Sequence, residues 1–244
     1  LLLENDLSKP SSAYEIYTGV LNTADYGIPH NRTRWYCVGF LRTPLRKKKD
    51  FKFPQTVTSL PISSFLDKLA STSNNEEAAT VRENISNAEK QSRDRGLDPS
   101  KDAIIIDVDA SKSKMTWKNG VSPCLTRSRY RGHWLSHLKR RMTLNEMMRL
   151  QGMCPESLTT TSSKVELGRQ IGNSMSVNVI QKILEAMCSH MGYSFTEKVE
   201  ICSVCDTNEG IISATHSGER SAANDDETAS QHGCGRRRSF QIEN

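Results

Sequence analysis

The sequence lacks any long hydrophobic run, and this absence excludes a transmembrane helix. Mean hydropathy is −0.58, and no apolar stretch approaches the roughly 18 residues that a bilayer-spanning helix needs. A secretory signal is also missing, because Leu1–Leu3 is followed at once by Glu4 and Asp6, without a basic region and an apolar core. The first residue is Leu1 rather than Met, so we interpret the start of the sequence as the cut edge of a longer chain.

Cysteine is too irregularly spaced to form a disulfide scaffold. The seven cysteines are an odd number, which indicates a reducing compartment. We therefore expect a protein that is not secreted, located in the nucleus if its source is eukaryotic and otherwise in the cytoplasm or nucleoid. The pair Cys202 and Cys205, even with His216, His232 and Cys234 beyond it, lacks a matched second pair, so we expect no metal site.

Positive charge is concentrated in the first three quarters of the chain. The formal net charge is +5. Residues 189–244 carry five Lys or Arg against nine Asp or Glu, whereas residues 1–188 carry 28 against 19. A basic body with an acidic tail favours an anionic polymer such as nucleic acid as partner. A solvated basic surface explains the same charges, so composition leaves both interpretations open.

Apolar periodicity predicts a mixture of strands and helices. Apolar and β-branched runs predict strands over 14–21, 35–40 and 103–108, the second being a continuous run typical of a buried strand. Helical spacing predicts helices over 62–69 and 173–187, and a capping box at Thr143–Glu146 opens another that ends near Gly152. Residues 71–101 and 192–244 are polar with little to bury, so we expect a mobile insertion and a disordered tail.

The first candidate motif lies directly before the strand at 35–40. It reads Asp25-Tyr26-Gly27-Ile28-Pro29-His30-Asn31-Arg32-Thr33-Arg34. Arg32 and Arg34 are two residues apart on an extended chain, so their side chains point the same way and can bind one anion together. Two surface arginines before a strand are the simpler interpretation of this run taken alone.

The second candidate motif is a basic segment from Arg127 to Arg141. It holds six Lys or Arg and no acidic residue, with Tyr130 and Trp134 among them. Basic groups interleaved with aromatic ones suit a phosphate backbone with bases nearby. A solvated basic face usually lacks the aromatics, so we favour nucleic-acid binding for this segment.

The third candidate motif is Gln170-Ile171-Gly172-Asn173-Ser174, at the start of the helix predicted from residue 173. A glycine followed by Asn-Ser at a helix start allows close backbone approach and offers unpaired N–H groups with two polar side chains. That combination suits the polar end of a small ligand. An ordinary helix N-cap is the simpler interpretation of this run taken alone.

Together and in this order, the three motifs resemble the C-terminal half of the cytosine-5 DNA methyltransferases. The run 25–34 is similar to motif VIII of that family, the run 141–152 to motif IX, and the run 170–174 to motif X. The resemblance covers roughly residues 10–190. It implies an α/β fold, namely the C-terminal portion of a Rossmann-like methyltransferase sheet plus a small target-recognition domain and a disordered tail.

The resemblance also implies a division of the chain. Residues 1–40 would end the catalytic-domain sheet and carry motif VIII, and residues 41–125 would form the target-recognition region, with the mobile insertion at about 71–101. Residues 126–191 would return motifs IX and X to the catalytic domain, and 192–244 would be the tail. The helix at 173–187 would pack against the missing N-terminal half, which would leave its apolar face exposed here.

Three motifs of that family have no counterpart in this sequence: the methyl-donor loop, the Pro-Cys nucleophile motif and the Glu-Asn-Val motif. In the family they precede motif VIII, so Cys124 of Pro123-Cys124, which follows it, is expected to be a small buried residue and not the nucleophile. His30 stands where motif VIII usually has glutamine. We therefore expect a fragment that is inactive alone and whose partner is the missing N-terminal half of the same enzyme.

For the complete enzyme, the resemblance implies methyl transfer from the cofactor S-adenosylmethionine to C5 of a cytosine flipped out of DNA. Two alternatives stay open: the tRNA-modifying branch of the same family, and a non-catalytic DNA-binding module. The resemblance assigns supporting catalytic roles to Arg34 and Arg32, cofactor binding to Asn173 and Ser174, and DNA contacts to Arg127, Arg129 and Arg131.

Overall fold

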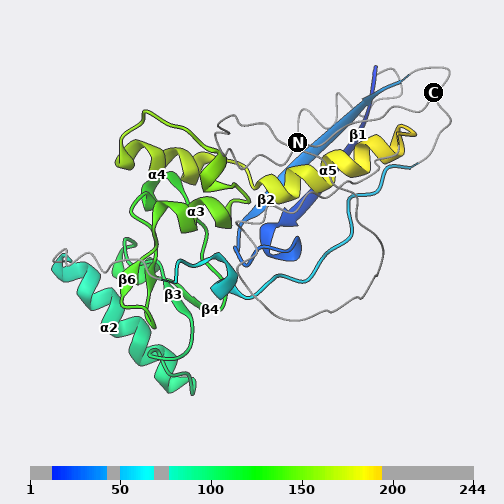
Figure 1. Cartoon of the computed structure of the whole chain (residues 1–244). Coiled ribbons are helices and arrows are strands. Elements are labelled where there is room, and N and C mark those ends of the chain that lie inside the picture. The colour runs from blue at the N-terminus through cyan, green and yellow to red at the C-terminus, as the bar shows by residue number, and fades with distance from the viewer. Residues whose placement is uncertain (1–12, 43–49, 69–76, 194–244) are drawn as a thin grey trace, which may run out of the picture.

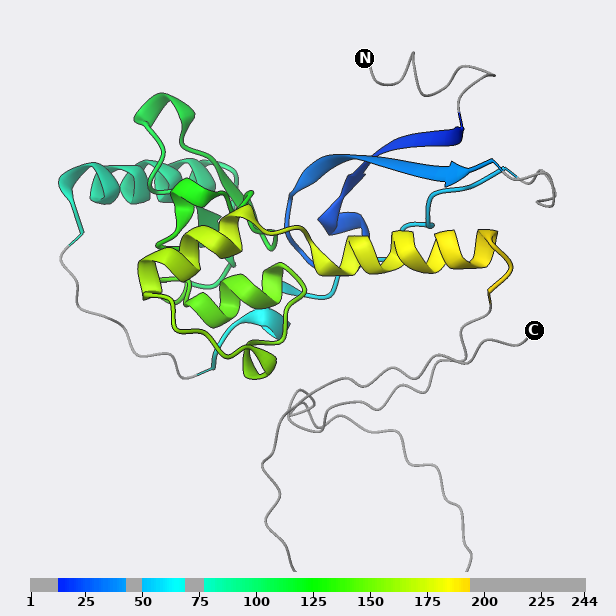
Figure 2. The same cartoon turned by 90° about the horizontal axis from the view of Figure 1, so that it is seen from above.

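The structure, a computed structural model, describes residues 13–42, 50–68 and 77–193 and consists of two lobes (Figure 1). A hairpin lobe is formed by β1, β2 and α5, and a mixed lobe by β3–β6 with α2, α3 and α4 (Figure 2). The strands are β1 (Tyr14–Asn22), β2 (Thr33–Leu41), β3 (Ile104–Ile106), β4 (Trp117–Asn119), β5 (Trp134–Leu135) and β6 (Arg140–Arg141). The α-helices are α2 (Ala79–Asp94), α3 (Leu144–Leu150), α4 (Lys164–Asn173) and α5 (Val177–His190).

The hairpin lobe confirms the first two predicted strands. β1 and β2 pair antiparallel, from Tyr14 opposite Leu41 to Asn22 opposite Thr33. Alternate residues of β2 are buried against α5 and form a core of their own. Trp35, however, is 56% exposed, so the expectation of a fully buried strand is wrong: the described residues cover one face of this hairpin.

Helix α5 packs its apolar face onto that hairpin, and Figure 1 shows the two running alongside one another. Val179 and Ile183 of α5 are buried in one cluster with Tyr36, Val38 and Phe40. The expectation that this helix would present its apolar face to the solvent is therefore wrong. The hairpin covers the face of α5 that was expected to contact the N-terminal half.

The mixed lobe is built on a four-stranded antiparallel sheet in the order β4-β3-β5-β6. Strand β3 contributes side chains to two separate cores, because successive side chains of a strand point to opposite faces of the sheet. Ile104 and Ile106 pack under α2, whereas Ile105 joins the cluster that contains residues of α3 and α4. The strand predicted over 103–108 is thus confirmed at its centre.

Helix α2 occupies most of the stretch expected to be a mobile insertion, so that expectation is wrong for residues 79–94. Its buried positions are Val81, Asn84, Ala88 and Ser92, which recur at helical spacing. Two of the four, Asn84 and Ser92, are polar, and Asn84 donates to the carbonyls of Val108 at 3.0 Å and Ala110 at 2.9 Å. A stripe of this composition leaves little apolar signal in the sequence.

The helix boundaries show one success and two corrections. Thr143 and Glu146 form the predicted capping box, and Gly152 follows α3 with φ of 76°. The helix predicted over 173–187 is α5, which begins four residues later, at Val177, and α4, which ends at Asn173, was not predicted. The helix predicted over 62–69 is, in its described part up to residue 68, a single 3-10 turn at Ile62–Phe65.

The remaining expectations concern the tail, the type of sheet and membrane-spanning helices. The tail and its Cys202–Cys205 pair lie outside the described residues. Within the described ranges every pair of named strands is antiparallel, so the Rossmann-like sheet stays a prediction. Among those residues, no helix has the length and apolar character that crossing a membrane requires.

Candidate active-site framework

Arg32 joins segments that are far apart in the sequence. Its guanidinium is buried, and Nη1 donates to the carbonyl of Leu125 at 2.5 Å while Nη2 donates to that of Ser174 at 2.6 Å. A longer contact of 3.4 Å reaches the carbonyl of Gly172. Burial lowers the pKa of this guanidinium below its ordinary value. The first and third sequence motifs therefore meet at one buried cation.

His30 also joins distant segments of the chain, through hydrogen bonds from both of its ring nitrogens to backbone groups. Its ring is fully buried, Nδ1 lies 3.1 Å from the carbonyl oxygen of Leu150, and Nε2 lies 3.0 Å from the backbone nitrogen of Leu125. Because a backbone N–H can only donate, Nε2 accepts and Nδ1 carries the proton. Burial, with the nearby charge of Arg32, lowers the pKa of His30 to about 3, so the ring is neutral.

The neutral ring explains how histidine can stand where the resemblance led us to expect glutamine. A neutral imidazole offers one N–H donor and one acceptor, and a glutamine amide offers both kinds of group as well. In the structure, the donor of His30 serves Leu150, which ends α3, and its acceptor serves Leu125. This role was not accessible from the sequence, because both partners lie about a hundred positions away along the chain.

A second buried network ties the end of α3 to the start of α5. Gln151 Nε2 donates to the carbonyl of Ile171 at 2.9 Å, and its Oε1 lies 3.3 Å from the hydroxyl of Ser176. That hydroxyl lies 2.6 Å from the hydroxyl of Thr23. Sequence reasoning missed these three polar residues as framework members. Gln151 lies within the run 141–152 that is similar to motif IX, and this position is the signal in the sequence that could have identified it.

Arg34 is exposed, unlike Arg32. Its Nη1 donates to the carbonyl of Thr33 at 2.7 Å, and its Nη2 lies 3.6 Å from Cys124 Sγ. Arg32 Nη1 lies 3.7 Å from the same sulfur, so the two side chains converge as their spacing predicted. Arg32 is already committed to backbone carbonyls, which leaves Arg34 as the arginine that can meet a ligand. Cys124 is half-buried, so the expectation of a buried thiol is only partly met.

The glycine of the third motif serves packing between protein segments. A Cβ added to Gly172 would lie 2.3 Å from both the carbonyl carbon and the oxygen of Thr126, and one added to Gly168 would lie 2.3 Å from the oxygen of Tyr130. The two glycines are one helical turn apart, so α4 lies directly on the segment 126–130. We expected a helix start open to a ligand; Gly172 and Asn173 instead end α4.

The polar residues of that motif differ in availability. Asn173 is exposed and borders an open depression. The hydroxyl of Ser174 donates to the carbonyl of Ile171 at 2.7 Å, and its own carbonyl accepts from Arg32. Asn173 thus offers a side chain to a ligand, whereas Ser174 is used mainly to hold the turn between α4 and α5.

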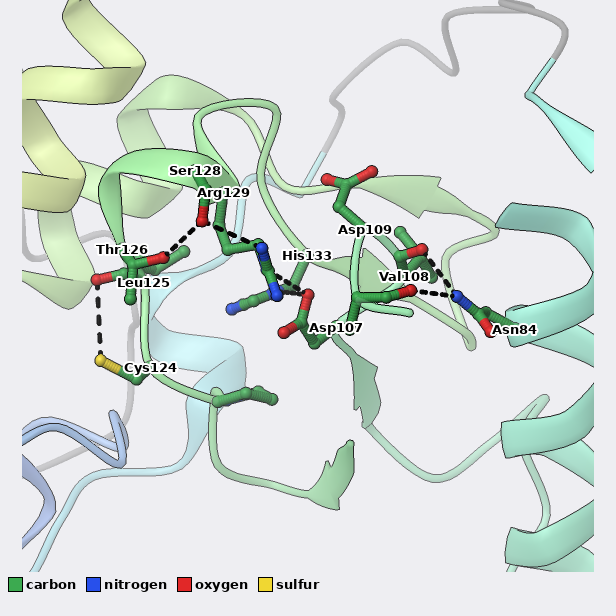
Figure 3. A network of polar contacts seen from close by, with 12 residues as sticks. Asn84, Asp107, Val108, Asp109, Cys124, Leu125, Thr126, Ser128, Arg129 and His133 are labelled. Atoms are coloured by element: carbon green, nitrogen blue, oxygen red, sulfur yellow. Dashed lines mark hydrogen bonds and ion pairs between the residues drawn. The ribbon is translucent and has the colours of Figure 1, made fainter. Parts of the chain in front are cut away.

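The basic segment 127–141 is largely neutralised by carboxylates, as Figure 3 shows for Arg129 and Asp107. Four of its arginines form ion pairs, so the segment is not a free basic face, and DNA contacts by Arg127, Arg129 and Arg131 stay a prediction. The pairs are Arg129–Asp107 at 2.6 Å, Arg131–Glu77 at 3.5 Å, Arg140–Glu146 at 2.6 Å, and Arg141 with Glu77 at 2.6 Å and Asp109 at 2.8 Å.

Two members of this segment form none of these close ion pairs with a carboxylate. Arg127 is exposed and pairs with no carboxylate in the part of the chain that the structure describes. His133 is buried 3.9 Å from Asp107, and burial lowers its pKa below the ordinary value. Arg127 lies on the rim of an open depression whose lining is Thr126, Arg127, Ser128, Tyr130, Arg169 and Asn173. No cluster of three or more metal-ligating side chains occurs among the described residues.

Comparison with known proteins places this framework in a family. The family model for C-5 cytosine-specific DNA methylases matches residues 6–189. The chain belongs to this family. Type II methyltransferase M.NlaX from Neisseria lactamica is 31% identical over 183 residues, covering 72% of this chain and 53% of that protein. Type II methyltransferase M.HaeII from Haemophilus aegyptius is 28% identical over 195 residues, covering 76% and 54%.

Among solved structures, the crystal structure of the S. pombe Dnmt2 methyltransferase matches with a TM-score of 0.50 at 16% identity, covering 74% of this chain and 60% of that one. That likeness shows the fold alone, with its mixed helices and strands. The chain spans about half the length of the curated relatives it matches. Membership in the C-5 cytosine methylase family, implied by the three motifs, is confirmed; the assignment of each run to motif VIII, IX or X stays a prediction.

The match to the C-5 cytosine methylases includes every residue of the framework. His30, Arg32, Gln151, Gly172 and Ser176 all lie between residues 6 and 189. They belong to segments that the sequence separates and the fold brings together.

Proposed function

We propose that this chain is the C-terminal portion of a DNA cytosine-5 methyltransferase, which in complete form methylates C5 of a cytosine flipped out of the duplex. The observation that carries the proposal is the convergence of the three motifs on the buried network around Arg32 and His30. In this proposal the nucleophile and the methyl-donor loop come from the remaining part of the methyltransferase domain, and the chain alone is inactive. Preorganised donors aimed at a reacting group are a large source of catalysis.

Arg34 is the residue that would meet the flipped nucleotide. Its guanidinium is exposed and anchored by one bond to the carbonyl of Thr33, so donors remain for the polar edge of cytosine or for its phosphate. Arg32 and His30 would act as positioning residues, because their polar groups are already bound to backbone atoms. They hold the backbone at the start of β2, from which the Arg34 side chain projects.

The residues present fit one edge of S-adenosylmethionine, which supplies the methyl group when bound. Asn173 has an exposed amide with a donor and an acceptor, as the methionine end of that cofactor requires. Ser174 fits less well as a direct ligand, because its hydroxyl and carbonyl are both engaged within the turn. We therefore assign cofactor contact to Asn173 and positioning of the turn to Ser174.

The partner of this chain would be the rest of the methyltransferase domain, seated on the uncovered face of the hairpin. Val20 pairs with Trp35 and Tyr14 with Leu41, and directly opposed residues share a face. These four side chains are 66%, 56%, 45% and 54% exposed, respectively. A two-stranded sheet is marginal by itself and gains stability from packing on further elements, so this apolar face suits the half that the relatives have in addition.

Reconstitution tests the proposal. The chain is purified alone and together with the part of M.NlaX that lies outside the match, and methyl incorporation from labelled S-adenosylmethionine is measured on DNA and on tRNA. We expect no incorporation by the chain alone and incorporation into DNA by the pair. Incorporation into tRNA only would select the tRNA branch. Tight association and DNA binding without any incorporation would select the non-catalytic module.

Trp35→Ser is the matched test of the docking face, because Trp35 is exposed in this chain and its loss should leave folding intact. We expect the variant to lose co-purification with the complementary half. Retained co-purification would contradict the assigned face.

A further inference from the structure

We infer that Arg127, Arg169 and Tyr130, with the hydroxyl of Thr126, form a contact site for the DNA phosphate backbone, in place of the predicted set Arg127, Arg129 and Arg131. The inference rests on the proposed function for its choice of DNA as ligand. It assigns binding to residues of α4 and the segment 126–130 that line one depression. Arg169 and Thr126 had no predicted role, and Tyr130 was singled out only as one of the aromatic residues of the basic segment.

The charges of the depression favour an anion. Arg127 is exposed and pairs with no carboxylate among the described residues. The guanidinium of Arg169 lies 5.3 Å from the centre of the Tyr130 ring, a stacking contact that holds it at the depression. Its one carboxylate contact, Glu166 at 3.6 Å, joins two side chains that are 41% and 45% exposed. Exposed pairs of this kind contribute little, so Arg169 can turn toward a phosphate.

Arg129 and Arg131 are poorly suited to the same task. Arg129 Nε lies 2.6 Å from a carboxylate oxygen of Asp107, and the two side chains are 22% and 13% exposed. Arg131 pairs with Glu77, which also accepts from Arg141. A phosphate at Arg129 would leave the partly buried carboxylate of Asp107 without this counter-charge, and a phosphate at Arg131 would have to compete with Glu77.

Arg129 contributes indirectly, through a chain of hydrogen bonds visible in Figure 3. Its Nη1 donates to Ser128 Oγ at 2.9 Å, and Ser128 Oγ lies 3.1 Å from Thr126 Oγ1. A guanidinium only donates, so Ser128 Oγ accepts from it and can donate its own O–H to Thr126 Oγ1. The Thr126 hydroxyl then has its proton to donate to an anion. Arg129 is thus a positioning residue.

The two sides of the depression are held at a fixed spacing. A Cβ at Gly168 or Gly172 would lie 2.3 Å from the backbone of Tyr130 or Thr126, which shows how closely α4 approaches that segment. Arg169 and Asn173 each directly follow one of these glycines. The site is therefore built on a tight helix contact and not on a free loop, and such rigidity favours binding of a ligand of defined shape.

The test compares two double variants of the full chain that each remove two positive charges. Arg127→Ala/Arg169→Ala removes the proposed contacts, and Lys101→Ala/Lys112→Ala removes two exposed cations that do not line the depression. Affinity for a short DNA duplex is measured between about 50 and 200 mM salt, because the slope of log affinity against log salt counts phosphate contacts. We expect the first variant to lower the slope by about 0.9 or more, and the second to leave the slope unchanged.

A folding control and the contrary outcomes complete the experiment. The melting temperature of both variants is measured first, and the lysine variant should fold normally because those side chains are 83% and 58% exposed. Equal loss of slope in both double variants would show general electrostatic attraction and overturn the site. Loss of tRNA binding without loss of DNA binding would assign the site to RNA and also overturn it. If the wild-type protein bound no DNA, that result would instead contradict both the proposed function and this site.

Discussion

Replacing His30 by glutamine should make the protein less sensitive to acid without weakening it at neutral pH. His30 has a pKa of about 3 in the folded protein against an ordinary value of 6.5. The unfolded chain therefore takes up a proton as pH falls through 6.5, whereas the folded chain does not. A depressed histidine pKa thus contributes stability that is present above pH 6.5 and is lost as pH falls toward 3.

The size of the effect follows from the shift. One unit of pKa difference corresponds to about 1.4 kcal/mol, so this single group removes about 2.7 kcal/mol of unfolding free energy over two pH units below 6.5. Glutamine does not titrate, so His30→Gln should lose this part of the pH dependence. It retains a donor for the carbonyl of Leu150 and an acceptor for the N–H of Leu125, and should stay within about 1.5 kcal/mol of the wild type at pH 7.

Denaturant unfolding followed over this pH range measures both quantities, and His30→Ala is the matched control. Alanine also abolishes the titration, but it leaves two buried backbone groups without a partner, each at a cost of about 1–3 kcal/mol. Both variants should therefore show the same reduced pH slope, and only alanine should lose stability at pH 7. Burial also lowers the pKa values of His133 and His137, but these residues remain in all three proteins. A wild-type slope in His30→Gln, or equal losses for both variants at pH 7, would refute the assigned role.

Three further outcomes are expected. Gly172→Ala should destabilise the protein by about 1–3 kcal/mol, because its Cβ would meet rigid backbone of Thr126, whereas Gly39→Ala meets only the flexible end of a side chain; similar melting temperatures for the two variants would contradict this. Arg32→Lys should lose about 1.5–3 kcal/mol, because one ammonium cannot reproduce the fork that reaches several carbonyls, and unchanged denaturant midpoints would exclude the role. In the reconstituted enzyme, Arg34→Lys should not restore the turnover lost in Arg34→Ala, and full rescue would show that charge alone suffices.

The parts of the fold that could be predicted are those whose signal is local. The strand Ile104–Ile106 and the capping box at Thr143 are confirmed because a β-branched run and a three-residue spacing carry them. Helix α2 was missed because half of its buried stripe is Asn84 and Ser92. Helix α4 was missed because its buried positions are Gly168, Ile171 and Gly172, so only Ile171 gives an apolar signal.

The candidate site was predictable only in its list of residues. Arg32 is bound to carbonyls and Arg34 is exposed, although the two residues are only two positions apart. No feature of the neighbouring sequence distinguishes them. The pairing of Arg129 with Asp107 likewise depends on a contact 22 positions away. Which basic residues remain free for a ligand is therefore a property of the folded chain.

The framework also has a consequence for the order in which the protein assembles. Its bonds join residues that are far apart in sequence: Thr23 to Ser176 across 153 positions, Arg32 to Ser174 across 142, and His30 to Leu150 across 120. Closing such long loops has a high entropic cost until other contacts bring the ends together. The hairpin and the short antiparallel sheet involve much closer partners and can form first. The network on which the proposed chemistry depends would then be the last part to form and the first to open, and its amide protons should exchange with solvent before those of either lobe.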